Sequence, residues 1–501
     1  MEKKFIIFSL LIGLFINLTV GCEGVDDYST NPNLRLDFST DTLSFDTVFT
    51  TIGSATRHFK VYNPNNENLR IESVMLANPG KSGFRINVDG RKGSSFRDID
   101  IWKRDSLYIL VEVTVDPNNS DQPMVVEDSI LFYTNGVRQS VLLQAYGQDV
   151  HLLKGGVTYT ENTTLTADRP YLIYDSLVVS EGVTATLQPG ATLYFHKHAS
   201  LIVSGNLKAK GTREKPIVFR GDRLDSIYAK TTLAYDRTPG QWGGIYFRAS
   251  SFDNEFEQVI VKNTTSGLFF HESTPDNLKI RIHDSQITNS QGNLLLAVNC
   301  RIEASNSEFT NATENTVCLI GGFYQFTHCT IANYMKLAPR KRVATLVLSD
   351  TAKIDNRSVH LPIRQAAFDN CIIDGSLHHD TTKLYRGEIA FFTKDNRPEG
   401  GDGFNYRFNA CLIQTKKITD NPRFVQCIFN QRPMYIRTGS EDDAYAFDFR
   451  LANKSVGISG ADRAITARYP TDRYGVGRLN NHTGPSIGAY EYVYQEEKKK
   501  K

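Results

Sequence analysis

Several features are scarce in this 501-residue sequence. It has five Met and two Trp, no Cys-x-x-Cys pair, and no apolar run of membrane-spanning length after residue 18. Lys and Arg number 57 against 55 Asp and Glu, so the formal charge is only +2. The basic excess of a nucleic-acid-binding surface is therefore missing. Without paired cysteines, nothing in the sequence supports a zinc or redox motif, and we expect neither a metal nor a cofactor.

Aromatic residues are abundant by comparison. The chain has 29 Phe and 23 Tyr, together with Trp 11% of all residues, and this favours strands over helices. At about 100–200 residues per domain, the length predicts two or three domains.

The first 21 residues have the pattern of a secretion signal. Lys3 and Lys4 precede a largely apolar run over residues 5–18. A helix of about 14 residues spans about 21 Å, less than the ~30 Å hydrocarbon core, so the run predicts a signal peptide rather than a transmembrane helix.

The end of this run, Leu18-Thr19-Val20-Gly21-Cys22, resembles a bacterial lipobox, although Thr stands where Leu is commoner. The resemblance implies lipidation of Cys22, a linker over residues 22–33, and a membrane partner held through the lipid anchor. Acidic residues come directly after Cys22, which is similar to surface-export signals of Bacteroidetes lipoproteins. The expected location is the outer membrane, at the cell surface or on the periplasmic face. An ordinary secretory signal with a chance cysteine remains the alternative to lipidation.

Residues 34–150 alternate in short strands separated by turn clusters such as Asn135-Gly136. About seven strands in such a length predict an immunoglobulin-like β-sandwich. The order of strands resembles the Ig-like modules of the ASPM–SPD2–hydin type, which implies a binding or spacer module. No Cys…Trp…Cys pattern indicates an antibody-like disulfide.

From residue 153 a repeat begins, in which a small residue or Cys precedes Ile or Phe and then a polar turn former. The first residues of successive repeat units are separated by 22, 22, 42, 40 and 16 positions. We interpret these spacings as a period of 20–22 residues, with two spacings of about twice that length. Such a period predicts a solenoid. The units begin at Ser285, Ser307, Cys329, Cys371, Cys411 and Cys427.

The composition of the repeat narrows the type of solenoid. A short β-rich unit cannot bury a core alone. When such units stack as coils about 4.8 Å apart, each backbone group can form a hydrogen bond with a neighbouring coil. The Leu framework of leucine-rich repeats is absent. We therefore predict an all-β chain, with the Ig-like sandwich followed by a right-handed parallel β-helix over residues 153–494 and a disordered basic tail over 495–501.

Segments such as "DSLVVSEGVTATLQPGATLYFHKHASLIVSGNLKAKGTREKPIVFRGDRLD" and "GPSIGAYEY" resemble β-helix lipoproteins of Bacteroidetes, within the pectate-lyase-like superfamily. The resemblance is specific for fold and weak for activity, since one solenoid carries many functions.

Four of the six later cysteines occupy the small position of the repeat, and we expect free, stacked thiols. Cys329 and Cys371 would lie two periods apart, at about 9.6 Å, which is beyond disulfide reach.

Two segments supply candidate ligand-binding residues. Trp242, within Gly-Gln-Trp-Gly-Gly, is a candidate sugar-stacking platform, although glycines turning a corner between coils explain this segment more simply. His378, His379 and Asp380 gather polar groups in an apparent insertion, for which a solvated surface loop is the alternative. Neither segment matches a known catalytic motif, so the catalytic residues are unknown.

These observations predict a monomeric, non-catalytic envelope lipoprotein that presents a β-helix face for glycan or surface binding, with no nucleic-acid partner. Two alternatives stay open. One is a polysaccharide lyase or glycoside hydrolase acting on a uronate-containing polysaccharide, and the other is a structural or adhesive protein that contacts another protein.

Overall fold

The computed structural model describes residues 27–226, 233–341, 343–354, 357–377, 387–394, 403–418, 420–439, 445–479 and 484–496. The chain divides into two compact units, residues 1–148 and 149–501. Within the described residues no helix is long and apolar enough to cross a membrane.

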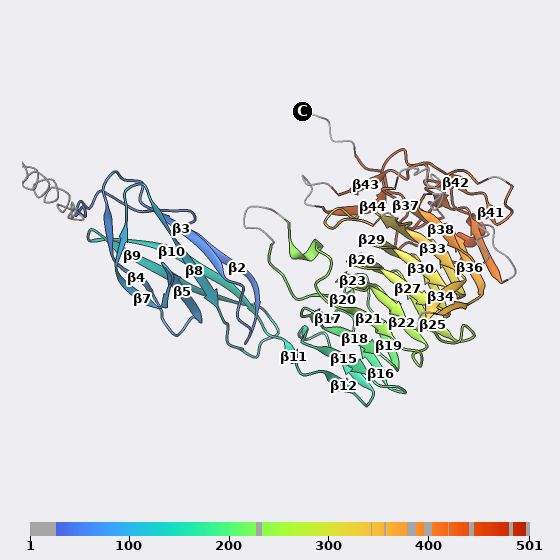
Figure 1. The fold of residues 1–501 in the computed structure, drawn as a ribbon, viewed down its shortest axis with the longest axis horizontal. Helices are drawn as coiled ribbons and strands as arrows, with labels where there is room; N and C mark the ends of the chain where they lie inside the picture. The colour runs from blue at the N-terminus through green and yellow to red at the C-terminus, as the bar shows by residue number, and fades with distance from the viewer. Residues whose placement is uncertain are drawn as a thin grey trace, which may run out of the picture. The chain divides into compact units, whose positions relative to one another are not determined.

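The first unit is a sandwich of two five-stranded sheets (Figure 1). One sheet has the order β1-β3-β8-β5-β6, with β1 (Asp37–Phe38), β3 (Arg57–Tyr62), β8 (Ser106–Val113), β5 (Phe84–Val88) and β6 (Arg91–Gly93). The other has the order β2-β10-β9-β4-β7, with β2 (Thr42–Phe49), β10 (Val137–Gln148), β9 (Met124–Thr134), β4 (Leu69–Leu76) and β7 (Ser95–Ile101).

All pairs in the sandwich are antiparallel except β2 with β10. In the longer strands buried and more exposed residues alternate, as in β8, where Leu107, Ile109 and Val111 face the core. The hairpin between β9 and β10 turns at Asn135 and Gly136, both with positive φ, as the Asn-Gly pair predicts.

The second unit is a parallel β-helix in which each regular coil gives one strand to each of three sheets (Figure 1). The eleven-stranded sheet contains β11 (His151–Leu153), β14 (Tyr171–Ile173), β17 (Thr192–Phe195), β20 (Ile217–Gly221), β23 (Val259–Thr264), β26 (Gln286–Ser290), β29 (Glu308–Ala312), β32 (Thr330–Asn333), β37 (Ile372–Gly375), β40 (Leu412–Ile413) and β42 (Ile428–Phe429).

The nine-stranded sheet contains β12 (Val157–Tyr159), β15 (Ser176–Val179), β18 (Ser200–Val203), β21 (Gly244–Phe247), β24 (Leu268–Phe270), β27 (Leu295–Val298), β30 (Val317–Ile320), β33 (Leu346–Ser349) and β38 (Ile389–Phe392). The ten-stranded sheet contains β13 (Thr163–Leu165), β16 (Thr184–Leu187), β19 (Asn206–Lys210), β22 (Asn254–Glu257), β25 (Leu278–His283), β28 (Arg301–Ser305), β31 (Gly322–Thr327), β36 (Ile363–Asp369), β39 (Phe404–Asn409) and β41 (Phe424–Val425). The expected fold class, a sandwich followed by a parallel β-helix, is confirmed.

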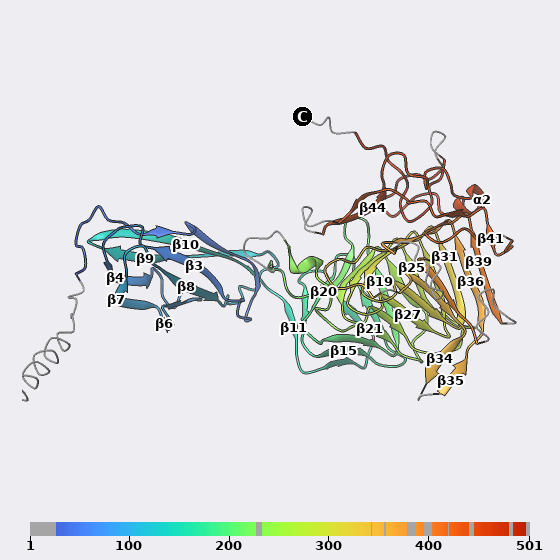
Figure 2. The ribbon, with the colours of Figure 1, turned by 45° about the horizontal axis from the view of Figure 1, so that its top comes forward.

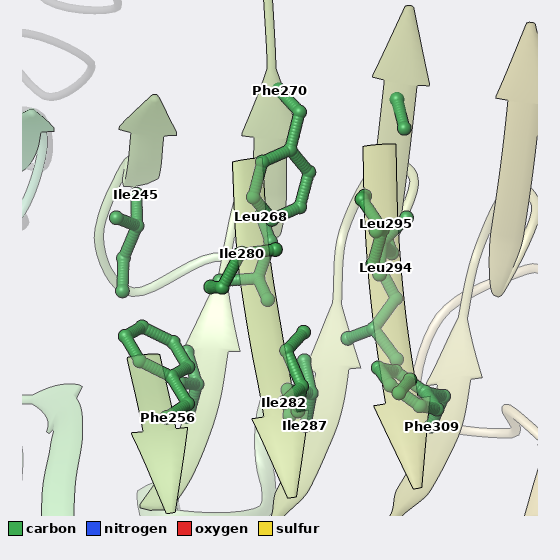
Figure 3. Packing of buried hydrophobic residues seen from close by; sticks show 14 of the residues in the cluster. Ile245, Phe256, Leu268, Phe270, Ile280, Ile282, Ile287, Leu294, Leu295 and Phe309 are labelled. Atoms are coloured by element: carbon green, nitrogen blue, oxygen red, sulfur yellow. The ribbon is translucent and has the colours of Figure 1, made fainter. Parts of the chain in front are cut away.

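The core of the solenoid fills the space between the three sheets (Figure 3). Side chains in the same register of successive coils lie above one another. Phe326, Phe368 and Phe408 stack in this way, with ring centroids 5.2 and 4.8 Å apart and nearly parallel planes. Stacked rings bury large apolar areas while each coil covers the next, so the core is continuous along the solenoid.

The repeat of small residue, Ile or Phe, and polar turn former has a backbone explanation. The residue before each small position has a positive φ, as in Asn306, His328 and Asn370. Asn and Asp tolerate this left-handed conformation better than most residues. The small side chain then accepts a hydrogen bond from the preceding coil: Ser285 N donates to Ser307 Oγ at 3.0 Å, and Cys329 N to Cys371 Sγ at 3.5 Å.

The spacings of 42 and 40 residues are single coils and not double periods. Thr330 in β32 pairs with Ile372 in β37, and Ile372 pairs with Leu412 in β40, so Cys329, Cys371 and Cys411 start adjacent coils. The 42-residue coil is lengthened partly by a hairpin of β34 (Thr351–Ile354) and β35 (Arg357–His360), which projects beside the sheets (Figure 2). The expected separation of about 9.6 Å is therefore wrong, because adjacent strands lie about 4.8 Å apart.

All six cysteines in the described residues are free, as expected. Cys329, Cys371 and Cys411 form a ladder of buried thiols, and burial raises the pKa of Cys371 well above its usual value. Each of these thiols donates to a backbone carbonyl, and Cys371 and Cys411 also accept the backbone N–H of the cysteine one coil before them.

The C-terminal segment covers part of the eleven-stranded sheet. It includes β43 (Tyr435–Thr438), β44 (Phe447–Leu451) and the short helix α2 (Arg463–Thr466). Ile487 and Ala489 pack on Ile372 and Leu412, whose side chains point outward from β37 and β40. Farther towards the N-terminal end, Asp236 of the 3-10 helix η1 (Tyr235–Arg237) bridges Arg220 and Lys262 of the same sheet. Much of the outer face of this sheet is therefore occupied by other parts of the chain.

Candidate functional site

The outer face of the ten-stranded sheet carries a row of polar residues in register. Glu255 of β22, Arg281 of β25, Glu303 of β28 and Gln325 of β31 occupy equivalent positions on four successive coils. A second row beside it contains His283 and Ser305, among others. Because alternate residues of a strand face the same side, these groups all point away from the core.

A pocket of about 320 Å³ lies on this face, where the two rows meet the C-terminal segment. We call it the polar groove. It is lined by Arg281, His283, Glu303, Ala304, Ser305, Gln325 and Tyr469. Five of these side chains carry polar groups from three adjacent coils, and Tyr469 adds an aromatic ring from outside the solenoid.

Glu303 is held by two guanidinium groups. Arg281 Nη2 lies 3.0 Å from Glu303 Oε2, and Arg301 Nη2 lies 2.7 Å from Oε1. Burial acts to raise the pKa of Glu303, but the hydrogen bonds from the two arginines outweigh burial and leave the pKa below its usual value. The carboxylate is therefore ionised and engaged, which does not suit a general acid.

His283 is engaged on both ring nitrogens. Its Nδ1 lies 2.8 Å from Ser305 Oγ, and its Nε2 lies 3.1 Å from a carboxylate oxygen of Asp284. Burial acts to lower the pKa of His283, but Asp284 and Glu257 raise it above 6.5 overall. With Asp284 at one ring nitrogen and Ser305 at the other, the imidazole of His283 is held in a fixed orientation.

The groove thus offers paired charges, a hydroxyl, an amide and an aromatic ring. Paired Arg and Glu side chains present planar donors and acceptors in fixed positions with little net charge. This arrangement suits a neutral ligand with many hydroxyl groups better than a polyanion or a reacting substrate.

Trp242 lies inside the solenoid and not on a face. Its side chain is fully buried, the indole stacks on Phe195 with centroids 4.1 Å apart, and Nε1 donates to the carbonyl of Lys262 at 2.8 Å. No ring face is left for a sugar, so the predicted stacking platform is wrong. The alternative, a corner turned by glycines, fits Gly240 and Gly244, which both have positive φ.

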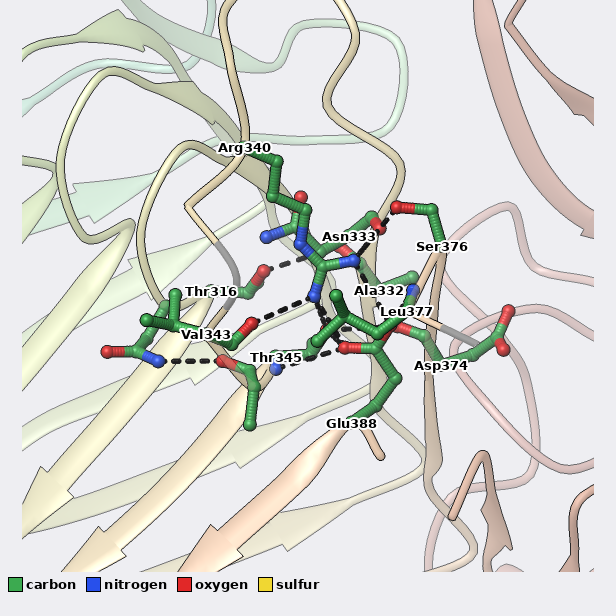
Figure 4. A network of polar contacts seen from close by, with 12 residues as sticks. Thr316, Ala332, Asn333, Arg340, Val343, Thr345, Asp374, Ser376, Leu377 and Glu388 are labelled. Atoms are coloured by element: carbon green, nitrogen blue, oxygen red, sulfur yellow. Dashed lines mark hydrogen bonds and ion pairs between the residues drawn. The ribbon is translucent and has the colours of Figure 1, made fainter. Parts of the chain in front are cut away.

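His378, His379 and Asp380 lie outside the described residues, so their predicted role stays a prediction. The segments that flank them meet in a buried polar network (Figure 4). Arg340 Nη1 and Nη2 donate hydrogen bonds to the carboxylate of Glu388 at 3.0 and 2.5 Å. Oε1 of this carboxylate also accepts a hydrogen bond from the backbone N–H of Leu377 at 2.7 Å. This network fixes both ends of the insertion to the solenoid corner.

Asp374, next to this network, has a carboxyl group with a raised pKa. Burial raises its pKa to about 7, although the Tyr334 hydroxyl donates to it at 2.6 Å. The residue is only 1% exposed, and Tyr334 and Tyr435 of the neighbouring hydrophobic cluster pack around it. Without access for a substrate, this carboxyl is part of the packing between the sheet and the C-terminal segment.

A larger cavity, of about 520 Å³, lies in the N-terminal sandwich beside β5 and β6. Arg85, Lys92 and Glu112 are its charged lining residues. Two of them are engaged within the sandwich, since Arg85 donates to Thr114 at 2.9 Å and Glu112 accepts from Thr56 at 2.6 Å. Across the described part of the chain no three His, Cys, Asp or Glu side chains gather as metal ligands do. Cys22 lies outside the described residues.

Sequence reasoning missed the polar groove. Its residues share no motif, because the outward positions of successive coils are free to vary while the inward positions repeat. Only the register between β25, β28 and β31 brings them together. The sequence does contain one signal for the groove, in the segments "KIRIHDS" and "RIEASNS". Once the Ile residues of these segments are assigned to the core, the polar residues between them are expected on the outer face.

Comparisons with known proteins identify no family, since no family model matches the chain. The protein bark beetle of Drosophila melanogaster is 35% identical over 140 residues, which is 27% of this chain but 4% of that protein. The chain therefore spans only a small part of this relative.

Two solved structures share limited similarity with the chain. The catalytic domain of a GH87 alpha-1,3-glucanase in complex with nigerose is 10% identical, covers 75% of this chain and 88% of its own, and has a TM-score of 0.18. The ASH/PapD-like domain of human CEP192 is 9% identical, covers 25% of this chain and 92% of its own, and has a TM-score of 0.17. Scores this low carry no argument about function.

Proposed function

We propose that this protein is a cell-envelope lipoprotein, anchored through Cys22, whose β-helix binds a glycan in the polar groove without transforming it. The anchor rests on the sequence around Cys22, and the ligand class rests on the groove. The sandwich serves as the spacer between the anchor and the solenoid.

The double engagement of Glu303 by Arg281 and Arg301 carries the ligand assignment. An ionised carboxylate with two guanidinium partners accepts and orients hydroxyl groups, while its lowered pKa argues against a role as general acid. Tyr469 at the rim supplies an apolar ring face of the kind that stacks on sugars.

A matched pair of variants tests the groove. Glu303→Gln removes one charge-assisted acceptor, for which we expect about tenfold weaker binding in calorimetric titrations against neutral polysaccharides. Glu255→Gln alters the equivalent position two coils away, outside the groove lining, and is expected to leave binding unchanged. Equal binding by both variants would contradict the assignment.

The enzymatic alternative is tested with the same material. A lyase acting on uronate polysaccharides releases unsaturated products that absorb ultraviolet light, and a hydrolase releases reducing ends. We expect neither from the wild-type protein at concentrations that saturate binding. Sustained product formation would replace the binding role with a catalytic one, whereas failure of every glycan would favour the protein-contact alternative.

The anchor has its own test. Cys22→Ala removes the thiol that carries the acyl chains, and each buried CH₂ contributes about 0.8 kcal/mol to membrane binding. We expect the variant to move from the membrane fraction to the soluble fraction of cells. Unchanged partitioning would contradict lipidation of Cys22 and leave the groove assignment standing.

A further inference from the structure

The cavity of about 520 Å³ in the N-terminal sandwich takes no part in the polar groove, and we call it the sandwich cavity. It lies beside β5, where the neighbouring strand β6 is short. β5 pairs with β8 over Phe84–Val88, but with β6 only from Ile86 onward. After Gly93 the chain crosses to β7 in the other sheet, so the space beside the start of β5 stays open.

Glycines form one wall of the sandwich cavity. Gly83 has a φ of 72°, and a Cβ at this position would lie 2.0 Å from the carbonyl oxygen of Thr114. A Cβ at Gly93 would lie 3.1 Å from the ring of Phe96. This wall therefore consists of backbone, because the fold leaves little room for a side chain at either position.

The side chains that line the cavity form two rows across the sheet. In the first row, Asn87 of β5 lies opposite Leu110 of β8 on one side and opposite Lys92 of β6 on the other. In the second row, Arg85 of β5 lies opposite Glu112 of β8. All five residues line the cavity. The first row thus passes from an apolar group through an amide to a cation.

The charges of the two rows leave one cation in excess. Glu112 and Arg85 are direct cross-strand neighbours, so their charges offset each other. Lys92 makes no ion pair or hydrogen bond within the part of the chain that the structure describes. With one excess positive charge, the cavity favours a ligand that carries one negative charge.

Hydrogen-bonding groups of the two rows remain available to such a ligand. Arg85 uses Nη2 to donate to Thr114 at 2.9 Å, which leaves other N–H groups of its guanidinium for a carboxylate. Glu112 accepts from Thr56 through Oε1, and its second oxygen can accept a further hydrogen bond. The side-chain oxygen of Asn87 is buried without a hydrogen-bond partner among the described residues, a cost that a ligand donor would remove.

We propose that the sandwich cavity binds a small monocarboxylate that carries hydroxyl groups, of the sugar-acid type. Lys92 and Arg85 hold its carboxylate, Asn87 and Glu112 accept its hydroxyl groups, and Leu110 contacts its carbon chain. A dianion such as phosphate is disfavoured, because the carboxylate of Glu112 lines the same space. A neutral polyol leaves the excess charge of Lys92 without a counterion. The site belongs to a different compact unit from the polar groove.

Titration with sodium gluconate, followed by nuclear magnetic resonance of the ligand, tests the site in the Cys22→Ala chain, which carries no acyl group. We expect saturable binding with a Kd of about 1 mM, as suits a ligand of about a dozen non-hydrogen atoms. Lys92→Ala should weaken binding at least tenfold. Arg91→Ala removes the same charge from the adjacent residue of β6, outside the cavity lining, and should leave binding unchanged. Both side chains are exposed, so neither substitution disturbs the core.

Three comparison ligands separate the contributions to binding. Sorbitol has the hydroxyl groups without the carboxylate, acetate has the carboxylate without the hydroxyl groups, and leucine adds an ammonium group. We expect each to bind at least tenfold more weakly than gluconate, and Glu303→Gln in the polar groove to leave gluconate binding unchanged. The proposal would be overturned by no saturable gluconate binding, by equal effects of Lys92→Ala and Arg91→Ala, by loss of binding in Glu303→Gln, or by a comparison ligand that binds as well as gluconate.

Discussion

The outer faces of the ten-stranded and nine-stranded sheets share one scaffold and differ sharply in chemistry. On the ten-stranded sheet, the row from Glu255 to Gln325 alternates charge between coils and is tied together by ion pairs such as Arg281 with Glu303. On the nine-stranded sheet, the row through Tyr246 and Phe269 is apolar. Both faces cover the same continuous core.

The contrast shows that the fold places few demands on outward positions. The inward Ile, Phe, Ser and Cys positions are restricted by packing, since each coil must match its neighbours. Outward residues are restricted only by what the face contacts. A polar face that is paired within itself therefore suits a hydroxyl-rich ligand.

The largest expected effect comes from the inward positions that both faces share. Phe368→Ala removes a ring stacked between Phe326 and Phe408, and buried Phe→Ala changes cost about 3–5 kcal/mol. Gln365→Ala, on the outer side of the same strand β36, is the control and should change stability by less than about 0.5 kcal/mol. Chemical denaturation measures both, and a similar loss for the two variants would contradict the inward assignment of Phe368.

A second effect, of similar size, separates the buried charge of Glu388 from the charges of the polar groove. Glu388 is fully buried, so Glu388→Ala leaves Arg340 without its carboxylate and should cost about 3–5 kcal/mol. Glu303→Ala removes a carboxylate that is 26% exposed, beside Arg281 at 53%, and should cost less than about 1 kcal/mol. Equal losses in denaturation would show that the groove pairs hold the fold and are not a ligand surface.

The smallest effect is an opposite response of the two faces to pH. On the polar face, His283 has a pKa above 6.5, so its stabilisation is present below pH 6.5 and is lost as the pH rises through its folded pKa. On the apolar face, burial and then Arg248 hold the pKa of His271 below 6.5. Its stabilisation is therefore present above pH 6.5 and is lost as the pH falls through the folded value.

Nuclear magnetic resonance titration of the two imidazoles checks this prediction directly. Replacing His283 or His271 by Gln, one at a time, assigns the signals. We expect the midpoint of His283 to lie above that of His271. The reverse order would mean that the carboxylate of Asp284 does not engage His283 as the 3.1 Å contact indicates.

Much of the solenoid is predictable from the sequence, because its inward positions repeat. The small residue before Ile or Phe, preceded by a residue with positive φ, recurs from Ser285 to Cys427. Coil length is less predictable, since loops and the hairpin of β34 and β35 insert at corners without disturbing the register. For this reason the spacings of 42 and 40 resemble two periods in the sequence although each is one coil.

The surface is the least predictable part. A tryptophan among glycines has no periodic neighbours in the sequence, so a binding face stayed a candidate beside the simpler corner for Trp242, yet the side chain fills the core beside Phe195. The groove residues Arg281 and Glu303 are 22 positions apart and meet only through strand register. Neither relation is visible until the coils are aligned in space.

The central claim is that the polar groove binds a neutral glycan and leaves it intact. Its most direct test is calorimetric titration of the purified protein with candidate polysaccharides, followed by measurement of products in the same samples. The account predicts saturable binding that Glu303→Gln weakens about tenfold, with no product formed. Cleavage of the bound polysaccharide, or binding that Glu303→Gln does not change, would contradict it.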